Sequence, residues 1–248
     1  MNTLTNLSGK TALITGGSRG IGAAVVRRFA QDGVAVAFTY ASSEQKARAL
    51  ADRIQTSGGV SLAINADSGD PEAVKAAVAQ AAGRFGRIDI LVNNAGILNL
   101  GALDDYSLAA FDQMIAVNVR AAFVAVQAAL PHMAVGGRII NTGSVTADRA
   151  GFPGTSVYAM TKGALAALTR GLARDLGPRG ITVNLVQPGP TETDMNASEE
   201  MRATVRPLMA LGRMGTDAEI ASLVAYLAGP EASFITGSAI TIDGGYLA

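Results

Sequence analysis

Short apolar runs rich in β-branched residues alternate with longer alanine-rich stretches along this chain. Several runs are nearly continuous in apolar residues, which is typical of strands buried on both faces of a parallel sheet. Strands that alternate with helices in this way predict a single doubly wound α/β domain, with a seven-stranded parallel sheet and helices on both faces. The expected strands cover residues 11–15, 34–39, 60–64, 88–93, 138–142, 181–186 and 239–242.

Capping residues mark the boundaries of several expected helices. Asp70 followed by Pro71 predicts a capped helix start, and Thr216 with Glu219 has the pattern of a capping box. We expect the long helix after residue 156 to stop at Gly177, just before a proline. No linker, repeat or low-complexity segment interrupts residues 1–248, so one domain is expected.

The charge balance restricts the class of partner. The 248 residues include 20 basic and 20 acidic side chains, which argues against nucleic acid or an anionic membrane bound by bulk charge. Without cysteine there is no disulfide framework, thiolate catalysis or thiolate metal site. The first residues lack an export signal, and the uncharged residues 121–137 fall short of a membrane span. We therefore expect a cytoplasmic protein.

A glycine loop, TGGSRGIG at residues 15–22, follows the first expected strand directly. Its glycines, Gly16, Gly20 and Gly22, differ in spacing from the usual G-x-G-x-x-G fingerprint. The physical functions are the same, because the loop turns tightly, lets backbone approach a pyrophosphate and presents free N–H groups of a helix N-terminus. The loop predicts a Rossmann-type dinucleotide site.

A tyrosine and a lysine stand about one helical turn apart in SVYAMTKGA, residues 156–164. Tyr158 and Lys162 therefore leave the same face of a helix. Upstream, Ser144 follows the fifth expected strand, and ligands bind at the carboxyl ends of strands in such folds. Taken alone, the pair is an ordinary surface contact and Ser144 is a turn residue.

The order and spacing of these elements resemble the short-chain dehydrogenase/reductase family over essentially the whole chain. The matching elements are TGGSRGIG, Asp67, NNAG at 93–96, Asn118, Ser144, YAMTK at 158–162 and PGPTET at 188–193. The resemblance implies an NADP-dependent oxidoreductase acting on a ketone or alcohol, similar to 3-oxoacyl-carrier-protein reductases and related bacterial ketone reductases. It implies a cofactor-binding half over about residues 8–143 and a catalytic half over about residues 144–248.

Four catalytic residues follow from the resemblance. Tyr158 would protonate the carbonyl oxygen, and Ser144 would hydrogen-bond that oxygen. A free phenol has a pKa of about 10, and a nearby ammonium favours the phenolate, so we expect Lys162 to lower the pKa of Tyr158. The family also implies that Lys162 holds the nicotinamide ribose, and that Asn118 holds a water linking Lys162 to solvent.

The cofactor contacts carried over from the family are Gly16, Ser18, Arg19, Gly20, Ile21, Gly22, Tyr40, Ala41, Ser42, Asp67, Ser68, Asn94, Ala95, Gly96, Tyr158, Lys162, Pro188, Gly189, Thr191 and Thr193. NAD-selective sites place an acid about 20 residues past the glycines, at the end of the second strand. Here that strand ends FTYASSEQ, and the first acid, Glu44, lies several residues further on. We expect NADPH, with Arg19 and Ser42 holding its 2′-phosphate. An NAD-dependent alcohol dehydrogenase is an alternative.

The substrate is less defined than the cofactor. Residues 145–156 and 191–210 are expected to wall its pocket, with Phe152, Met195 and Met209 as apolar candidates. No basic cluster marks a carrier-protein site, because the nearby arginines, Arg120, Arg149 and Arg206, are isolated in the sequence. A small ketone and a carrier-bound acyl substrate both remain open. The single histidine, His132, is expected to be structural, and no metal site is expected.

Assembly and a second function remain open as well. The helices expected at 111–130 and 157–176 carry more apolar side chains than one sheet face covers. The family resemblance implies a homotetramer, a dimer of dimers, with a dimer as alternative. Phrases such as VRRFAQDG and LAGPEASFITG also resemble a family member described as a cyclic-dinucleotide-binding biofilm regulator. The four catalytic candidates favour an enzyme, because a pure binder does not need all of them.

Overall fold

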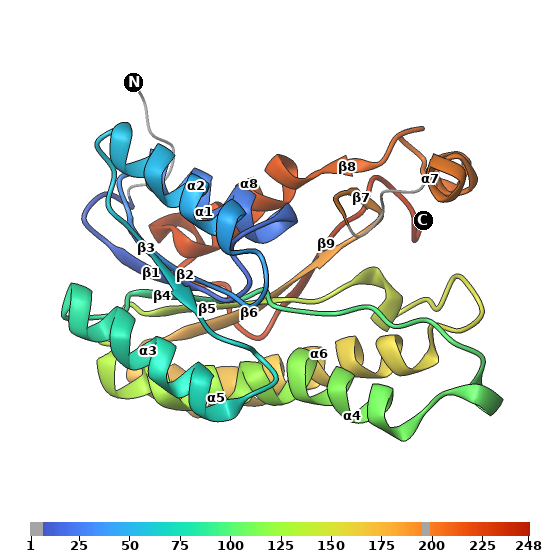
Figure 1. Cartoon of the computed structure of the whole chain (residues 1–248), viewed down its shortest axis with the longest axis horizontal. Coiled ribbons are helices and arrows are strands. Elements are labelled where there is room, and N and C mark those ends of the chain that lie inside the picture. Colours follow the sequence, from blue (N-terminus) through green and yellow to red (C-terminus); the bar gives the residue numbers. More distant parts are fainter. Residues whose placement is uncertain (1–6, 195–198) are drawn as a thin grey trace.

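The computed structural model describes residues 7–194 and 199–248 of the chain. Within these residues, seven strands form one parallel sheet in the order β3-β2-β1-β4-β5-β6-β9 (Figure 1). The strands are β1 (Thr11–Ile14), β2 (Ala35–Tyr40), β3 (Ser61–Asn65), β4 (Ile90–Asn93), β5 (Arg138–Thr142), β6 (Thr182–Pro188) and β9 (Ala239–Ile242). The predicted doubly wound fold is confirmed, and its strand ends differ from the expected ones by at most two residues.

Burial of the strands explains their composition. Every residue of β1, β4 and β6 is buried, because helices cover both faces of the sheet there. The two edge strands are less covered, and β9 alternates between exposed and half-buried residues. The continuous apolar runs of the sequence therefore belong to the centre of the sheet.

Two helical layers enclose the sheet (Figure 1). One layer contains α1 (Gly20–Gln31), α2 (Glu44–Thr56) and α8 (Asp217–Ala228), which share an apolar cluster with the strands around Phe29 and Phe38. The opposite layer contains α3 (Pro71–Phe85), α5 (Ala121–Ala129) and α6 (Ser156–Leu176), packed around Leu91 and Ile139. The two clusters give the sheet an apolar core on each face.

The helix expected at residues 111–130 is interrupted by a π-helical turn. It consists of α4 (Leu108–Ile115), the π-helical turn Ala116–Arg120 and α5. A π turn rotates the residues within it relative to a regular helix, and such turns are frequently found at functional sites. Here Asn118 belongs to the turn, and its side chain is almost fully buried.

Among the described residues, Leu108–His132 is the one helical stretch whose length and composition would suffice to cross a bilayer. Half of its most apolar window is buried inside the protein. Within this stretch, α5 packs against α3 and β4. Packing inside the domain therefore accounts for much of its apolar character.

The predicted helix caps are mostly present. Asp70 accepts a hydrogen bond from the Glu72 N–H at 2.9 Å, and Thr216 with Glu219 forms the capping box that begins α8. The predicted stop of the long helix at Gly177 is confirmed. α6 does end at Leu176, but Gly177 keeps a right-handed conformation and opens a short 3₁₀ turn, Gly177–Arg179. Pro178 fits the start of this right-handed turn. The residue with left-handed backbone geometry is therefore Gly180, which ends the turn with φ +66°.

A small lobe lies beyond the carboxyl ends of the sheet strands (Figure 1). It contains α7 (Glu199–Val205) and a second parallel pair of strands, β7 (Thr191–Glu192) and β8 (Gly215–Thr216). Strands of two residues leave no periodic pattern in a sequence, so this pair was not predicted. The lobe forms one wall of the main cavity.

A buried chain of polar side chains links the centre of the sheet to α6. Asn93 Nδ2 donates to Asn141 Oδ1 at 2.9 Å, and Asn141 Nδ2 donates to Thr169 Oγ1 at 2.9 Å. The Thr169 hydroxyl in turn donates to the Leu165 carbonyl. These bonds connect β4, β5 and α6, and Asn141 at their centre is fully buried.

Replacing Asn141 with alanine should lower the free energy of unfolding by about 2–4 kcal/mol, because buried donors and acceptors would lose their partners. Urea unfolding followed by circular dichroism measures the change. Asn65→Ala is the matched control, since the side chain of the exposed Asn65 donates one hydrogen bond, to the Ala41 carbonyl. Equal losses in the two variants would show that the buried chain does not stabilise the fold.

Candidate active site

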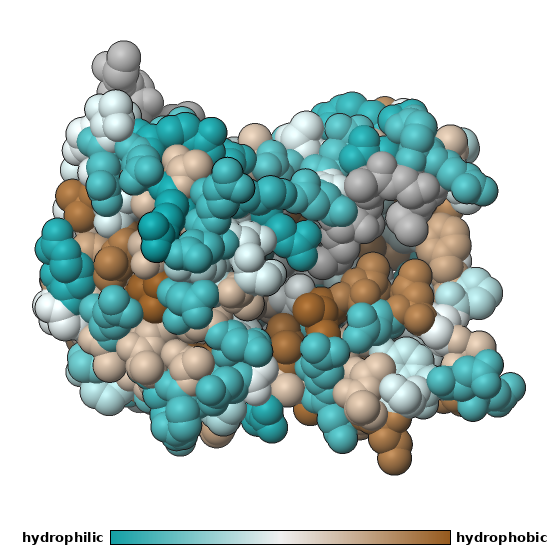
Figure 2. All heavy atoms as spheres, viewed as in Figure 1, coloured by the Kyte–Doolittle hydropathy of each residue, from teal (hydrophilic) through white to brown (hydrophobic). Residues whose placement is uncertain are grey.

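The main cavity lies outside the carboxyl ends of the sheet strands, where the strand order reverses between β1 and β4. Ligands bind at such switch points in open α/β sheets. Its volume is about 970 Å³. Figure 2 shows apolar side chains gathered where the surface is hollowed, between the small lobe and the layer that contains α6. The cavity is large enough for an elongated ligand and a smaller second molecule.

The glycine loop forms one end of the cavity. Gly16 has φ +67°, and a Cβ on Gly22 would lie 2.2 Å from the Gly16 carbonyl oxygen, so both positions require glycine. At the start of α1, Arg19 makes no side-chain capping hydrogen bond. The first N–H groups of α1 can therefore bind an anion. The loop fits the pyrophosphate of a dinucleotide.

Asn94 holds the glycine loop against β4. Its Nδ2 donates to the carbonyl oxygens of Thr15 at 3.1 Å and Gly16 at 3.0 Å, while its backbone N–H donates to Thr15 Oγ1. Asn94 was predicted to line the adenosine side, and it does line the cavity. Its amide donors, however, are used to shape the loop.

The end of β2 contributes no acid to the cavity. Tyr40 ends the strand, and Ala41, Ser42 and Ser43 line the cavity before α2 begins at Glu44. The Glu44 carboxylate is paired with Arg48 on its own helix. Arg19 lines the same part of the cavity and is exposed. From the end of β2, a ribose 2′-phosphate would therefore meet hydroxyls and no carboxylate, with the Arg19 guanidinium close by.

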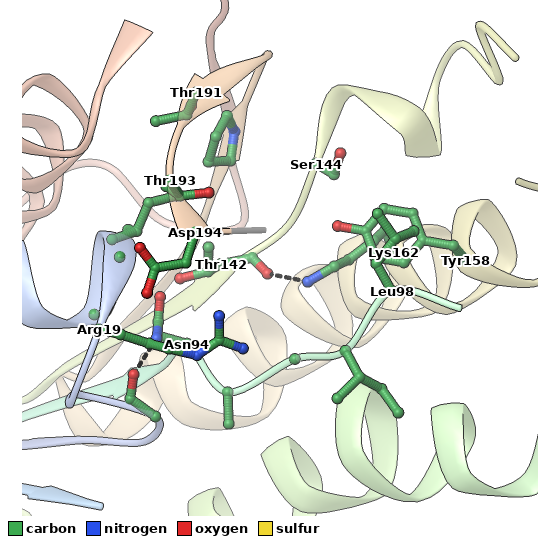
Figure 3. A pocket seen from close by; sticks show the side chains of 18 of the residues that line it. Arg19, Asn94, Leu98, Thr142, Ser144, Tyr158, Lys162, Thr191, Thr193 and Asp194 are labelled. Carbon is green, nitrogen blue, oxygen red and sulfur yellow. Dashed lines mark hydrogen bonds between the residues drawn. The ribbon is translucent and has the colours of Figure 1, made fainter. Parts of the chain in front are cut away.

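The predicted catalytic side chains lie at the opposite end, next to β5 and α6 (Figure 3). Ser144 follows β5, and its hydroxyl accepts from the Thr146 N–H at 3.1 Å and donates to Thr146 Oγ1 at 3.0 Å. Tyr158 and Lys162 come from successive turns of α6. The Lys162 ammonium donates to the Thr142 carbonyl oxygen at 2.9 Å. The end of β5 thus positions both Ser144 and Lys162.

Burial controls the protonation of the tyrosine and the lysine. Loss of solvation lowers the pKa of Lys162 from its usual 10.5 to about 8. The same effect raises the pKa of Tyr158, and the Ser144 hydroxyl opposes it only in part. The expectation that Lys162 lowers the tyrosine pKa is not met in this structure. The Lys162 Nζ is bonded to Thr142 and lies 5.6 Å from the centroid of the Tyr158 ring.

Asn118 is the predicted site residue that does not line the cavity. Its Nδ2 donates to the Ile97 carbonyl at 2.9 Å and to Thr161 Oγ1 at 3.1 Å, and its Oδ1 accepts from the Ile97 N–H at 2.8 Å. The side chain therefore ties the segment after β4 to α6. Its oxygen and the Lys162 Nζ each lie 3.5 Å from the position that a Cβ of Gly96 would occupy.

All other predicted site residues line this one cavity. The remaining cofactor candidates among them are Ser18, Gly20, Ile21, Asp67, Ser68, Ala95, Gly96, Pro188, Gly189, Thr191 and Thr193. Of the expected pocket residues, Phe152 lines the cavity, Met209 is buried behind its wall against Tyr246, and Met195 lies outside the described residues. His132 is exposed and does not line the cavity.

Sequence reasoning missed Thr142 and Tyr246. Thr142 acts through its backbone carbonyl, which carries no residue signature. Tyr246 lies in the apolar wall with Val145 and Val205, and its carbonyl accepts a hydrogen bond from Arg149 Nη1 at 3.0 Å. A lone aromatic near the end of the chain matches no motif. No group of three or more potential metal ligands is found in the part of the chain that the structure describes.

Known proteins with this fold match nearly the whole chain. A short-chain dehydrogenase/reductase from Serratia marcescens is 56% identical, with 98% of this chain and 100% of that chain covered and a TM-score of 0.95. A short-chain dehydrogenase from Burkholderia cenocepacia J2315 in complex with NADP is 51% identical, with the same coverage and a TM-score of 0.96. The cyclic-di-GMP-binding biofilm dispersal mediator protein of Escherichia coli strain K12 is 48% identical over 240 residues, which cover 96% of this chain and 98% of that protein.

A family model described as enoyl-(acyl carrier protein) reductase matches residues 16–247. The match begins in the glycine loop and includes Ser144, Tyr158 and Lys162 as well as the cavity wall around Tyr246. With the sequence identities and the shared fold, it shows that the chain belongs to the short-chain dehydrogenase/reductase family.

Proposed function

We propose that the chain is an NADPH-dependent reductase that converts a ketone to an alcohol, with Tyr158 as the proton donor. The observation that carries the proposal is the sharing of one cavity by the glycine loop and by Ser144, Tyr158 and Lys162. The family uses nicotinamide cofactors, and the Burkholderia relative was crystallised with NADP. The absence of an acid at the end of β2 further supports the phosphorylated cofactor.

The side chains suit acid catalysis in the direction of reduction. The bound cofactor supplies a hydride to the carbonyl carbon. The Ser144 hydroxyl can hydrogen-bond the carbonyl oxygen, and the phenol proton of Tyr158 then passes to that oxygen as its negative charge develops. The raised pKa of Tyr158 keeps the phenol protonated at neutral pH. Lys162, held by Thr142, keeps further N–H donors for a ribose hydroxyl.

The walls of the cavity favour an uncharged, apolar ketone. Leu98, Val145, Phe152, Val205, Met214 and Tyr246 contribute apolar surface. Two acids, Asp194 and Glu200, are the charged lining residues that the structure describes within the expected substrate walls, and Asp194 lies at the cofactor end near Arg19. Nearby arginines are engaged inside the chain, because Arg149 binds the Tyr246 carbonyl and Arg206 binds Glu199. A carrier's phosphate would have to displace these partners to pair with either arginine.

The oligomeric state and the cellular location are further proposals, drawn from the family resemblance. We expect a homotetramer, because apolar side chains are exposed on two separate faces. Phe123 on α5 and Met160 on α6 belong to one, and Tyr226 and Phe234 near the C-terminal end belong to the other. A cytoplasmic location remains a prediction from the sequence.

A second candidate function is binding of a cyclic dinucleotide. It is favoured by the identity of 48% to the Escherichia coli protein, which is described as binding cyclic-di-GMP. Calorimetric titration with cyclic-di-GMP, beside ketone reduction assays, distinguishes the two. Turnover without dinucleotide binding supports the reductase, and binding without turnover supports the alternative.

Tyr158→Phe should keep the fold and NADPH binding but reduce ketone turnover by about 10²–10⁴-fold, as expected for a lost general acid. The loss of NADPH absorbance in the presence of an uncharged ketone measures turnover, and fluorescence titration measures binding. Tyr226→Phe, an exposed position on α8, is the matched control and should be unaffected. Near wild-type turnover by Tyr158→Phe would exclude Tyr158 as the proton donor.

The pH dependence should report the ionisation of Lys162. Its pKa in the free protein is lowered to about 8, so the ammonium is present below that pH and is lost above it. Because kcat/KM reports ionisations of the free enzyme, kcat/KM for NADPH should be constant near neutrality and decline as pH rises through about 8. Lys162→Met should be less active and lack this decline. A wild-type kcat/KM unchanged up to a pH of about 10 would contradict the role of Lys162.

Arg19→Ala should raise KM for NADPH by about tenfold and change KM for NADH by less than about twofold, because it removes a charge-assisted contact to the 2′-phosphate. Initial rates with both cofactors measure the difference. Arg48→Ala is the control, since Arg48 is an exposed arginine on α2 that pairs with Glu44. A wild-type kcat/KM that favours NADH would overturn the cofactor assignment.

A further inference from the structure

An ion pair joins a lining residue at the cofactor end of the cavity to α2. Lys46 Nζ donates to Asp194 Oδ2 at 2.8 Å, which joins α2 to the segment that follows β7. The two residues are 148 positions apart in the sequence. Both side chains are more than half exposed, at 61% and 53%. The pair therefore links Asp194, which lines the cavity, to Lys46, which is not among the lining residues.

The carboxylate of Asp194 faces a second cation. The hydrogen bond and charge of Lys46 lower the pKa of Asp194, and the charge of Arg19 adds to this effect. Asp194 and Arg19 both line the cavity, and Figure 3 shows them at the same end of it. One acid is thus placed near two bases, on the side where Ser42 and Ser43 also line the wall.

The segment that carries Asp194 lies over the start of α1. A Cβ on Gly20 would be 3.6 Å from the side chain of Thr193, the residue before Asp194. Lys46 belongs to α2, which begins directly after Ser43. The Asp194 carboxylate therefore occupies the neighbourhood in which Arg19 and Ser42 are proposed to receive the 2′-phosphate of NADPH.

Fold stability does not explain this arrangement. Ion pairs between exposed side chains contribute little to the free energy of unfolding, because water already solvates both charges. The pair Arg27–Asp217 also joins two elements, but neither residue lines the cavity. A carboxylate at the phosphate end of the cavity has a direct electrostatic consequence for an anionic ligand, since like charges at short range repel.

We propose that Lys46 and Asp194 set the preference between NADPH and NADH. Lys46 is a second cation for the 2′-phosphate beside Arg19, and Asp194 is the anion that pairs with Lys46 until the phosphate displaces it. Asp194 thereby weakens the binding of NADPH relative to NADH, while Lys46 strengthens it. The inference rests on the proposed function, because it requires a cofactor site that accepts the 2′-phosphate.

Dissociation constants for NADPH and NADH, measured by fluorescence titration at low ionic strength, test the proposal without turnover. Lys46→Gln should weaken NADPH binding by about tenfold, and Asp194→Asn should tighten it by about threefold to tenfold, each with NADH changed by less than about twofold. In the double variant, Asp194→Asn should have a smaller effect than alone, because the competition for Lys46 is gone. Asp217→Asn, which removes an acid from an ion pair away from the cavity, should change neither constant.

Two outcomes would overturn the inference. Equal weakening of both cofactors by Asp194→Asn would show that the pair is a structural latch, and unchanged constants in both single variants would show an inert surface contact. These failures are distinguishable from failure of the proposed function. Wild-type protein that binds NADH more tightly than NADPH, or binds neither, would refute the cofactor assignment itself.

Discussion

The hydrogen bond from the buried Lys162 ammonium to the Thr142 carbonyl oxygen organises the candidate site. Lys162 is only 4% exposed, and its ammonium is costly to bury. The carbonyl acceptor at 2.9 Å offsets part of that cost. The bond joins α6, which carries Tyr158, to the end of β5, which leads directly to Ser144. The three side chains of the proposed reaction are therefore placed by one contact between a helix and a strand. The hydrogen bond from Asn141 to Thr169 joins the same strand to the same helix.

The cavity combines two halves with different physical properties. At the glycine loop, backbone N–H groups and the exposed Arg19 favour anions, as a pyrophosphate and a ribose phosphate require. At the other end, burial disfavours charge, which lowers the pKa of Lys162 and raises that of Tyr158. The apolar wall around Val145 and Tyr246 extends this environment to the substrate side. The same cavity therefore suits both the charged cofactor and the uncharged substrate proposed above, because the two environments lie at opposite ends of it.

The sequence was sufficient to predict the sheet and most of the residues that line the cavity, because buried strands and glycine turns depend on local residue types. It was insufficient where a property depends on contacts between distant residues. The π turn that buries Asn118 and the partners of its amide at Ile97 and Thr161 could not be read from periodicity. The predicted lowering of the Tyr158 pKa was wrong, because spacing along a helix does not reveal the burial of the phenol, which raises its pKa. The Lys46–Asp194 pair and the position of Tyr246 depend likewise on how the small lobe folds over the sheet.

The proposed reaction is the transfer of hydride from NADPH to a carbonyl carbon in this cavity. The most direct measurement uses NADPH carrying two deuterium atoms at C4 of the nicotinamide, with an uncharged apolar ketone and the wild-type protein. Mass spectrometry and proton NMR of the alcohol locate the label. We expect one deuterium on the carbinol carbon of the product. Alcohol without deuterium at that carbon, or no alcohol from a panel of such ketones despite bound NADPH, would contradict it.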